Sequence, residues 1–407
     1  MSDSSVVRTL FLAIVAEVIG FGIVLPIIPV ILTEPSSPYF LLPAGFTVDQ
    51  GFILVGLLIG AYPVAQFFST PILGEISDIH GRRTVISVSI LGTVIASLIF
   101  GYGILVKDLW LLFASRAVNG LTGGLISVAQ ATVADVTDAG TRSESFGVIG
   151  AAFGIGFIIG PFIGGVLSSD ISPFFSPATP FWFAAALSLA SLAYVLLRLE
   201  ETSPMEDRRV NWFKPVSQLR RGLALPGLRT LFGANFFYFS GFAFFTTFAP
   251  VFLVERFGFD QFQTGTFFLY IGVLAIFGQI VLVRYVFRRV EEERFIPHLL
   301  FLTGLFIFLQ PLQPALTPFL IVVALFSFSN GLARVALNTV VSQRAGEEHQ
   351  GLALGTNQSL RALGTAIPSA LSGLSAALFF AAMPLYIAGA VIMLTAAGYA
   401  ALRGRGH

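Results

Sequence analysis

The sequence contains no cysteine, and only 11% of its 407 residues are charged. Without thiols the chain can form no disulfide, iron-sulfur cluster or thiolate metal site. A soluble protein of this length needs many more charged side chains to keep its surface hydrated. Because 55% of the residues are hydrophobic, the composition excludes a soluble globular protein and indicates a chain whose apolar surface faces a lipid bilayer.

Lysine and histidine are also scarce, and neither is placed for chemistry. Lys107 and Lys214 lack the glycine-rich turn that a phosphate-binding loop requires. The histidines lie at or beyond the ends of apolar runs, too scattered for a zinc site or a nucleophile relay; they are His80, His298, His349 and His407. The net charge of +1 offers no basic surface for nucleic acid. We therefore expect no enzyme, no nucleic-acid partner, no metal ion and no cofactor.

Twelve apolar runs are long enough to cross a bilayer, which takes roughly 20 helical residues. They predict an all-α membrane protein with twelve transmembrane helices. The predicted spans are 6–32, 51–73, 84–106, 109–133, 146–168, 180–198, 228–254, 263–287, 295–312, 317–342, 351–380 and 383–402. The first run continues through Pro26 and Pro29 without a small-residue cleavage site, so we expect a membrane helix and not a signal peptide.

The longest polar stretch, 199–227, separates two sets of six spans. It predicts an N-terminal bundle over 1–198 and a C-terminal bundle over 228–407, joined by a cytoplasmic linker. Within the linker, Trp212 to Arg221 form either a short interfacial helix or a solvated loop. Eighteen of the 23 lysines and arginines fall on one side of the spans, which places both termini in the cytoplasm. An internal repeat of this kind is typical of alternating-access transporters.

The most specific motif is the loop after the second span, Gly74-Glu-Ile-Ser-Asp78-Ile-His-Gly81-Arg82-Arg83. An acid at a helix end, a glycine that permits a tight turn and two arginines can form a charged cluster on the cytoplasmic side. The alternative is a topological anchor, in which Arg82 and Arg83 only follow the preference for basic residues on that side. Composition alone does not separate the two interpretations.

This loop resembles the signature between helices two and three of the major facilitator superfamily. Further segments resemble its twelve-span drug/proton antiporters, with bacterial tetracycline exporters as the nearest subgroup. These segments are Ala16–Pro29, Tyr62–Gln66, Arg116–Gly120, Ala134–Thr137 and the run around Gly160 and Pro161. The resemblance is dense in the first half and loose in the second. It implies the major facilitator fold, with two pseudo-symmetric six-helix bundles. We expect a monomeric transporter in the cell membrane whose partners are a small-molecule substrate, protons and lipid.

The resemblance also implies a cytoplasmic gate. Asp78 is expected to face the start of the eleventh span, where the helix dipole attracts an anion. Arg82 is expected to pair with Asp135. Together these contacts would hold the cytoplasmic ends of the two halves closed. The predicted gate residues are Gly74, Asp78, Gly81, Arg82, Arg83 and Asp135.

Glu17 is the one acid well inside a predicted span, roughly 15 Å deep by helical rise. A carboxylate there is costly when charged, so the neutral form is favoured until water or a partner stabilises the anion. Such a group suits a proton carrier; the alternative is a structural acid at a helix contact. The resemblance implies that Arg116, in the fourth span, assists proton transfer. The alternative is that Arg116 only packs between helices or snorkels toward the membrane surface.

The fifth span carries the run Gly156-Phe-Ile-Ile-Gly160-Pro161-Phe-Ile-Gly164-Gly165. Glycines four residues apart lie on one helix face and permit close packing against another helix, and Pro161 adds a local bend. Packing alone would explain the pattern. The resemblance identifies it as an antiporter motif that seals the two halves on the outside.

Polar and aromatic side chains within the spans are candidates for a substrate cavity: Tyr62, Gln66, Gln130, Asn235, Tyr238, Asn330, Arg334, Asn357 and Arg361. The aromatic seventh span suits amphipathic molecules, although lipid-facing phenylalanine is the simpler interpretation. Because the second half has no acid within its spans, Arg334 and Arg361 need carbonyls, water or an anionic substrate group as partners.

Three functional hypotheses follow. The first is a proton-coupled exporter of small amphipathic compounds, in which Glu17 exchanges a proton against substrate. The second is a facilitator or importer of a small metabolite, which could be anionic and would use Arg334 or Arg361. The third is a non-transporting protein built on the same fold. The tetracycline exporters that the chain resembles carry further functional charged residues in their second-half helices, whereas the second half here has no acid within its spans, which argues against tetracycline as the substrate. The second half also lacks the Gly-Arg-Arg turn, which predicts a less defined gate there.

Overall fold

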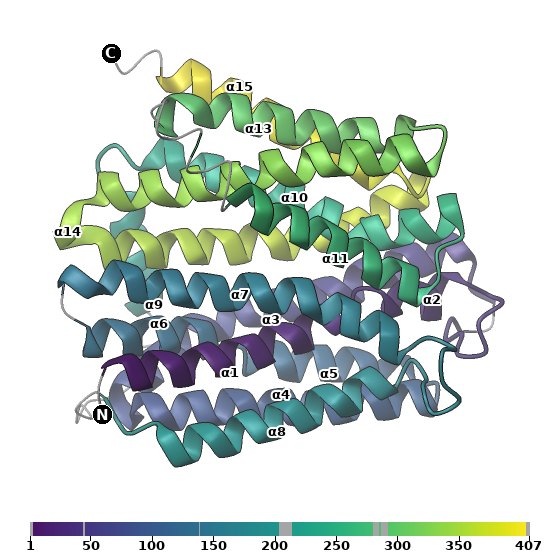
Figure 1. Ribbon diagram of the computed structural model, residues 1–407, viewed down its shortest axis with the longest axis horizontal. Helices are drawn as coiled ribbons and strands as arrows, with labels where there is room; N and C mark the ends of the chain where they lie inside the picture. Colours follow the sequence, from purple (N-terminus) through teal and green to yellow (C-terminus); the bar gives the residue numbers. More distant parts are fainter. Residues whose placement is uncertain are drawn as a thin grey trace. The chain divides into compact units, whose positions relative to one another are not determined.

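The computed structural model describes residues 3–43, 45–137, 139–202, 214–279, 285 and 292–403. Within these residues every regular element is a helix, as the apolar runs predict (Figure 1). Ten helical segments are long and apolar enough to cross a membrane. They are α1 (Asp3–Ile23) with α2 (Ile27–Thr33), α3 (Val48–His80), α4 (Arg82–Leu105), α5 (Leu109–Leu121) with α6 (Leu125–Val136), α7 (Ala139–Leu167), α8 (Thr179–Arg198), α10 (Arg229–Phe257), α13 (Glu292–Leu309) with η2 (Gln310–Leu312), the first part of α14 (Leu316–Leu378), and α15 (Met383–Arg403).

The two remaining predicted spans are also helical. A shorter apolar helix, α11 (Gln261–Phe277), occupies most of the described part of the eighth span. The long helix α14 covers both the tenth and the eleventh. Its helical geometry is interrupted at Gly346, which has φ 65° and ψ 170°. Glycine tolerates such a positive φ, so the chain bends where the loop between these spans was predicted.

Two predicted spans are each divided into two helices. In the first, Pro26 precedes α2, and a proline disfavours helical geometry in the residue before it. In the fourth, Thr122, Gly123 and Gly124 separate α5 from α6, because glycine has little helix propensity. A break inside a span frees backbone carbonyl groups that need another hydrogen-bond donor. Gln66 does this for the second break, donating a 2.9 Å hydrogen bond to the carbonyl of Gly123.

The chain forms two compact units. The first unit comprises residues 1–48, 61–215 and 259–269, and the second comprises 49–60, 216–258 and 270–407. In the first unit α1 packs against α7 and α8, and α4 packs against α5 and α8. In the second unit α10 and α13 each pack against α14 and α15.

Burial divides the apolar side chains of the first unit into a core and an exposed surface. Leu10 and Ile14 of α1, Ile86 of α4 and Val128 of α6 are fully buried in one core cluster. The opposite face of α4 exposes large apolar side chains at helical spacing: Val88, Leu91, Ile95, Leu98, Tyr102 and Leu105. Such a stripe suits contact with lipid.

The described part of the linker contains a helix, α9 (Lys214–Leu223). Its helical conformation is confirmed, and its place at the membrane interface stays a prediction. Trp212 and Phe213 lie outside the described residues.

Candidate functional site

Glu17 lies on α1 in the first unit, and its side chain is only 8% exposed. Its Oε2 atom accepts a 2.7 Å hydrogen bond from the hydroxyl of Thr93 on α4. The same hydroxyl lies 3.3 Å from Oδ1 of Asn119 on α5 and 3.3 Å from the carbonyl of Ser89. The predicted acid is therefore buried among polar groups supplied by two other helices.

The sequence interpretation missed Thr93 and Asn119 as members of this site. A signal for Thr93 was present, because Ser89, Thr93 and Ser97 are four residues apart and share one face of α4, where all three are buried. Ser115 adds a second link between the helices by donating a 2.7 Å hydrogen bond to the carbonyl of Ala96. A polar stripe on an otherwise apolar span thus marked the face of α4 that meets the acid.

Arg116 lies on α5 and is 2% exposed. Its guanidinium carbon is 5.0 Å from the ring centroid of Tyr62 and 6.0 Å from that of Phe21. Phe21 is one helical turn beyond Glu17, so the acid and the arginine share a neighbourhood. The contacts described for the first unit include no ion pair between them. Instead, Arg116 contacts two aromatic rings, an arrangement of cation-π type.

Tyr62 is held in place by Gln66, one turn further along α3. Nε2 of Gln66 donates a 2.9 Å hydrogen bond to the Tyr62 hydroxyl oxygen and another to Gly123, as described above. Gly120 allows α5 to pack closely against α3, because a Cβ atom at Gly120 would lie 2.5 Å from the Tyr62 carbonyl oxygen. Tyr62 and Gln66 therefore order the surroundings of Arg116. Gln130, the third candidate of this unit, is half-buried on α6.

The glycine face predicted in the fifth span packs against α1. A Cβ atom at Gly156 would lie 2.7 Å from Cβ of Val18, and one at Gly160 would lie 2.7 Å from the carbonyl oxygen of Ile19. The same construction at Gly164 reaches the carbonyl oxygen of Ile23 at 2.6 Å. These contacts confirm close packing of α7 on the stretch of α1 that carries Glu17.

The other two motif residues extend this packing. A Cβ atom at Gly22 of α1 would lie 2.7 Å from Cδ of Pro161. At Gly165 an added Cβ atom would collide with the carbonyl oxygen of Gln261, at the start of α11. The motif therefore contacts α1 along its length and α11 at its end.

Arg82, the first residue of α4, is the centre of a charged cluster. Its Nη1 atom is 2.7 Å from Oδ1 of Asp78, and its Nε atom is 2.9 Å from Oδ2 of Asp135. Nη1 also donates a 2.5 Å hydrogen bond to Oγ of Ser77. The predicted pair of Arg82 and Asp135 is thus present, and it joins the end of α6 to the loop between α3 and α4. The expected contact of Asp78 with the eleventh span stays a prediction.

Glu201 completes this cluster, although the sequence interpretation placed it in the linker. Its carboxylate accepts hydrogen bonds from the backbone N-H groups of Arg82 at 2.7 Å and Arg83 at 3.2 Å. A carboxylate in this position accepts hydrogen bonds from N-H groups at a helix N-terminus that have no partner within the helix, and the positive end of the helix dipole stabilises its charge. Gly81 has φ 92°, and a Cβ atom there would collide with the Glu201 carboxylate.

The two remaining predicted gate residues, Arg83 and Gly74, differ in their contacts. Nη2 of Arg83 donates a 2.5 Å hydrogen bond to the carbonyl of Leu196 on α8. Together with Glu201, it ties the loop to the end of the sixth span. A Cβ atom at Gly74 would meet nothing within 4 Å, so the described residues give no packing reason for glycine there.

The second unit contains a charged cluster that was not expected. Glu293 on α13 accepts two hydrogen bonds from Arg344 on α14, at 2.5 and 3.1 Å. The backbone carbonyl of Glu293 accepts a 3.0 Å hydrogen bond from Arg403 on α15. Arg344 also donates to the carbonyl of Gly227 at 3.1 Å. The second half therefore has a defined ionic contact shortly after the eighth predicted span of the chain. It is built around an acid, whereas the cluster of the first half is built around Arg82. Arg284, Arg288 and Arg289 of that loop lie outside the described residues.

The remaining cavity candidates lie on α10 and α14 of the second unit. The hydroxyl of Tyr238 donates a 2.5 Å hydrogen bond to Oδ1 of Asn330. Asn235 donates to the carbonyl of Leu231 on its own helix at 3.1 Å, and Asn357 is buried. Arg334 and Arg361 are half-buried.

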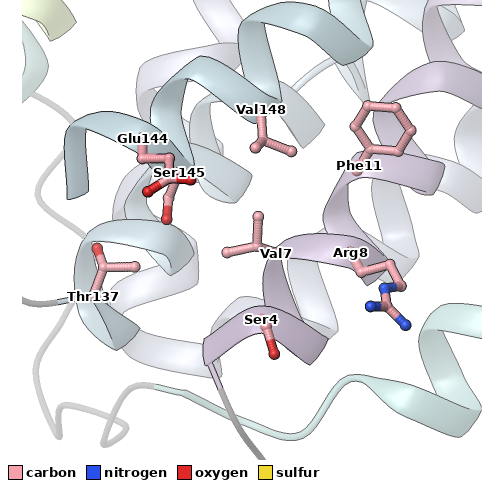
Figure 2. A pocket seen from close by; sticks show the side chains of 8 residues that line it. All are labelled: Ser4, Val7, Arg8, Phe11, Thr137, Glu144, Ser145 and Val148. Atoms are coloured by element: carbon pink, nitrogen blue, oxygen red, sulfur yellow. The ribbon is translucent and has the colours of Figure 1, made fainter. Parts of the chain in front are cut away.

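Figure 2 shows a pocket of about 550 Å³ in the first unit, formed by the beginnings of α1 and α7 and the residue after α6. Val7 of α1 and Val148 of α7 face each other across it (Figure 2). Its lining residues are Ser4, Val7, Arg8, Phe11, Thr137, Glu144, Ser145 and Val148. This described lining includes none of the predicted site residues.

Comparison with known proteins agrees with this arrangement. The family described as "Major Facilitator Superfamily" matches residues 10–369. Major facilitator superfamily domain-containing protein 10 of Mus musculus is 26% identical over 406 residues, covering 90% of this chain and 86% of that protein. The class C tetracycline resistance protein of Escherichia coli is 32% identical over 239 residues, which are 57% of this chain and 55% of that protein.

Among solved structures, the human organic anion transporter MFSD10 (TETRAN) has a TM-score of 0.71 at 23% identity. The match covers 98% of this chain and 100% of that one. At this identity the likeness shows the fold alone. The protein is a multi-pass membrane transporter and not an enzyme, and the chain belongs to the Major Facilitator Superfamily.

Proposed function

We propose that this protein is a proton-coupled exporter of small amphipathic compounds that works by alternating access. The observation that carries the proposal is the buried Glu17 carboxyl and its hydrogen bond to Thr93. An ionisable group inside a membrane span is costly, and such groups mark ion and proton pathways. The tetracycline resistance proteins among the relatives support export as the direction of transport.

The surroundings of Glu17 suit two protonation states. When the carboxyl is ionised, the Thr93 hydroxyl donates to it at 2.7 Å. When the carboxyl is protonated, it can donate to the Thr93 oxygen, while the Thr93 hydroxyl turns toward Oδ1 of Asn119 at 3.3 Å. Only one hydroxyl rotation separates the two arrangements. Proton uptake and release at Glu17 therefore need no buried polar group to lose all its partners.

We propose that Arg116 supplies fixed positive charge to the surroundings of this carboxyl. A guanidinium keeps its proton at every physiological pH, and that of Arg116 is held over Tyr62 and Phe21. Its field favours the ionised form of an acid nearby. We assign Arg116 the role of assisting proton release from Glu17 without forming a direct ion pair with it.

The glycine face of α7 links the proton site to helix packing. Val15, Val18 and Ile19 of α1 contact the glycines of α7 and flank Glu17 in the sequence. A tight backbone contact cannot absorb a shift of α1 by side-chain repacking. A change in the hydrogen bonding of Glu17 would therefore be passed to α7, which is how we connect protonation to a conformational change.

We also propose that the Arg82 cluster is a cytoplasmic gate. The ends of α3, α4 and α6 are held together by this cluster, which comprises Asp78, Gly81, Arg82, Arg83 and Asp135. We expect these contacts to change during transport. Its support is the set of ion pairs around Arg82. The distribution of lysine and arginine supports a position of this loop and of both termini on the cytoplasmic side of the cell membrane. The transporting species in this proposal is a monomer.

Proton release from the purified protein tests the proposal. The protein in weakly buffered detergent solution is titrated with ethidium, 2-naphthol or 2-naphthoate while a pH indicator reports released protons. Binding of a transported probe should release protons from the wild type and not from Glu17→Gln. Glu34→Gln, outside the spans, is the matched control and should behave as the wild type. Equal proton release from Glu17→Gln and the wild type would refute the role of Glu17.

A second candidate function is a facilitator or importer of an anionic metabolite. The observation that favours it is the pair of half-buried arginines, Arg334 and Arg361, in a half without acids inside its spans. The description of human MFSD10 as an organic anion transporter agrees with it. Uptake by proteoliposomes that follows the substrate gradient and does not change with pH would favour this function over proton-coupled export.

A further inference from the structure

Arg116 of α5 is a buried cation that has no hydrogen-bond acceptor among the described residues. The residue is 2% exposed, and its Nε atom is buried without a partner. A guanidinium carries five N-H donors in one plane. Burying such a charge is costly unless it is paired and hydrogen-bonded. The first unit therefore holds a positive charge that still needs an acceptor.

Two aromatic rings lie against this charge without supplying that acceptor. The guanidinium carbon of Arg116 is 5.0 Å from the ring centroid of Tyr62 and 6.0 Å from that of Phe21. The centroids of the two rings are 5.3 Å apart. Ring faces attract a cation, but the N-H groups in the plane of a guanidinium form their strong hydrogen bonds with anionic groups. The rings thus hold Arg116 in place and do not satisfy its N-H donors.

The hydroxyl of Tyr62 is a second donor without an acceptor among the described contacts. Nε2 of Gln66 donates to the Tyr62 oxygen and to the carbonyl of Gly123, both at 2.9 Å. These two bonds use both hydrogens of the Gln66 amide nitrogen, so Gln66 acts on Tyr62 as a donor. The hydroxyl hydrogen of Tyr62 then remains for another acceptor, beside a guanidinium with which Tyr62 interacts electrostatically.

The helices around Arg116 bring a single carboxyl group, that of Glu17. Its Oε2 atom accepts from Thr93, and the described contacts of Glu17 include no bond to Arg116. When Glu17 is protonated, Arg116 is the one remaining charge in the surrounding segments, whose ionisable side chains are Glu17, Tyr62 and Arg116. These segments are 9–33, 61–74, 84–101 and 109–134.

The burial of this place selects a small ligand. Phe21 and Gln66 at its rim are half-buried and Tyr62 is 8% exposed, whereas Arg116 is almost fully buried. A small inorganic anion can reach such a guanidinium with less rearrangement than a bulky organic anion. It also accepts hydrogen bonds from several directions, as the donors of two helices require.

We propose that Arg116 and Tyr62 bind a small monovalent anion, such as chloride, in the interior of the first unit. The guanidinium supplies the charge and the in-plane N-H donors, and the Tyr62 hydroxyl supplies one further hydrogen bond. Phe21 and the Tyr62 ring keep the guanidinium in position. The site goes beyond the proposed exchange of protons against substrate, which requires no anion.

Anion binding is expected to act on Glu17, a consequence that rests on the proposed function. Tyr62 interacts electrostatically with both Glu17 and Arg116. A bound anion offsets the charge of Arg116 and therefore favours the protonated form of Glu17. Because such coupling is reciprocal, protonation of Glu17 strengthens anion binding.

Chloride binding to the full-length protein in lipid nanodiscs tests the site. The line width of the chloride NMR signal is measured while sodium chloride replaces sodium gluconate at constant ionic strength. Bound chloride relaxes faster than free chloride, so a specific site gives an excess line width that falls as the site saturates. We expect this excess for the wild type, with a dissociation constant in the millimolar range, and not for empty nanodiscs.

Variants identify the binding groups. Arg116→Gln should abolish the saturable excess, and Arg116→Lys should retain part of it, since it keeps the charge and loses the planar donors. Tyr62→Phe keeps the ring and loses the hydroxyl, so it should weaken binding roughly 10- to 100-fold. Arg198→Gln removes an exposed arginine at the end of α8; it is the control and should bind as the wild type. A melting transition in gluconate shows that each variant folds, and Tyr62→Phe decides the question if Arg116→Gln does not fold.

Three results would overturn the site. The first is a wild-type protein without a saturable excess line width, as expected if only water and the rings surround Arg116. The second is wild-type affinity for chloride in Tyr62→Phe together with a folded Arg116 variant. The third is displacement of bound chloride by 2-naphthoate, because Arg116 would then accept a bulky organic anion.

Proton uptake separates this site from the proposed function. Sodium chloride added to the weakly buffered wild type should cause proton uptake that sodium gluconate does not cause. Glu17→Gln should bind chloride and take up no proton. Loss of chloride binding in the wild type with substrate-induced proton release intact would refute the anion site alone. Chloride binding that is accompanied by equal proton uptake in Glu17→Gln and the wild type would refute the role of Glu17 and leave the anion site standing.

Discussion

The hydroxyl of Thr93 donates a 2.7 Å hydrogen bond to Oε2 of Glu17, across the contact of α4 with α1. Thr93 is 2% exposed, so no bulk water replaces this donor when it is removed. A hydrogen bond to an ionised group contributes about 1.5–3 kcal/mol. The chemistry of Glu17 therefore depends on a residue 76 positions away in the sequence.

Replacing Thr93 with valine tests this dependence. Thr93→Val removes the donor at nearly constant volume, so the ionised form of Glu17 becomes less favourable. Release of the proton then requires a higher pH, and we expect the midpoint of the pH dependence of transport to rise by about one unit. Transport by proteoliposomes measured from pH 5 to 9 gives the midpoint. Thr93→Ser keeps the hydroxyl and should restore the wild-type profile, whereas an unshifted midpoint in Thr93→Val would contradict the role of this bond.

A methyl group on the glycine face of α7 is expected to destabilise the protein. In Gly160→Ala the new Cβ atom would lie 2.7 Å from the Ile19 carbonyl oxygen and 3.1 Å from Cα of Gly22, and backbone atoms cannot move aside as a side chain can. We expect a loss of about 1–3 kcal/mol, seen as a lower melting temperature of the detergent-solubilised protein together with slower transport. Gly154→Ala lies on the same helix, where an added Cβ atom meets nothing within 4 Å, and it should be neutral. Equal stability of the two variants would show that α7 and α1 are not tightly packed.

The glycine face could be predicted because its signal is local. Residues four apart on a helix share a face whatever the rest of the chain does, so Gly156, Gly160 and Gly164 indicated a packing surface without their partner being known. The apolar runs indicated the spans in the same way, since each run alone meets the length requirement of a bilayer. Glu17 was identified because a charge inside such a run is costly wherever it packs.

The partners of these residues could not be predicted, because they depend on which helices meet. The polar stripe of α4 marks Thr93 as part of a helix contact, but it does not identify Glu17 as the partner, and nothing in the sequence links Asn119 to Thr93. Arg116 was expected to act beside the acid, yet its described contacts are the rings of Tyr62 and Phe21. Glu293 carried no motif at all, since its role depends on an arginine 51 residues away.

Neutralising Glu201 is expected to loosen the start of α4. Glu201→Gln keeps the size of the side chain but replaces the carboxylate that accepts from the Arg82 and Arg83 backbone N-H groups. Loss of a good N-terminal cap costs about 0.5–2 kcal/mol. Hydrogen exchange at the first turn of α4 should become faster, while the neighbouring Glu200→Gln should leave it unchanged. Equal exchange in both variants would mean that the Glu201 carboxylate does not stabilise this turn.

Glu293 offers a test of the charged cluster in the second unit. Its carboxylate is held by Arg344 in a bidentate contact, and Arg403 lies 3.7 Å from it. The Arg344 side chain is 42% exposed, so solvent weakens the pair and we expect Glu293→Gln to cost about 0.2–1 kcal/mol. The loss should be largest at low salt, because ions screen partly exposed charges. Exchanging the two charges, in Glu293→Arg with Arg344→Glu, should recover less than the full loss, since the new arginine would stand beside Arg403. Melting temperatures at low and high salt measure these effects, with Glu292→Gln on the same helical turn as the control. A fully restored melting temperature in the exchanged variant would mean that Arg403 takes no part in the cluster.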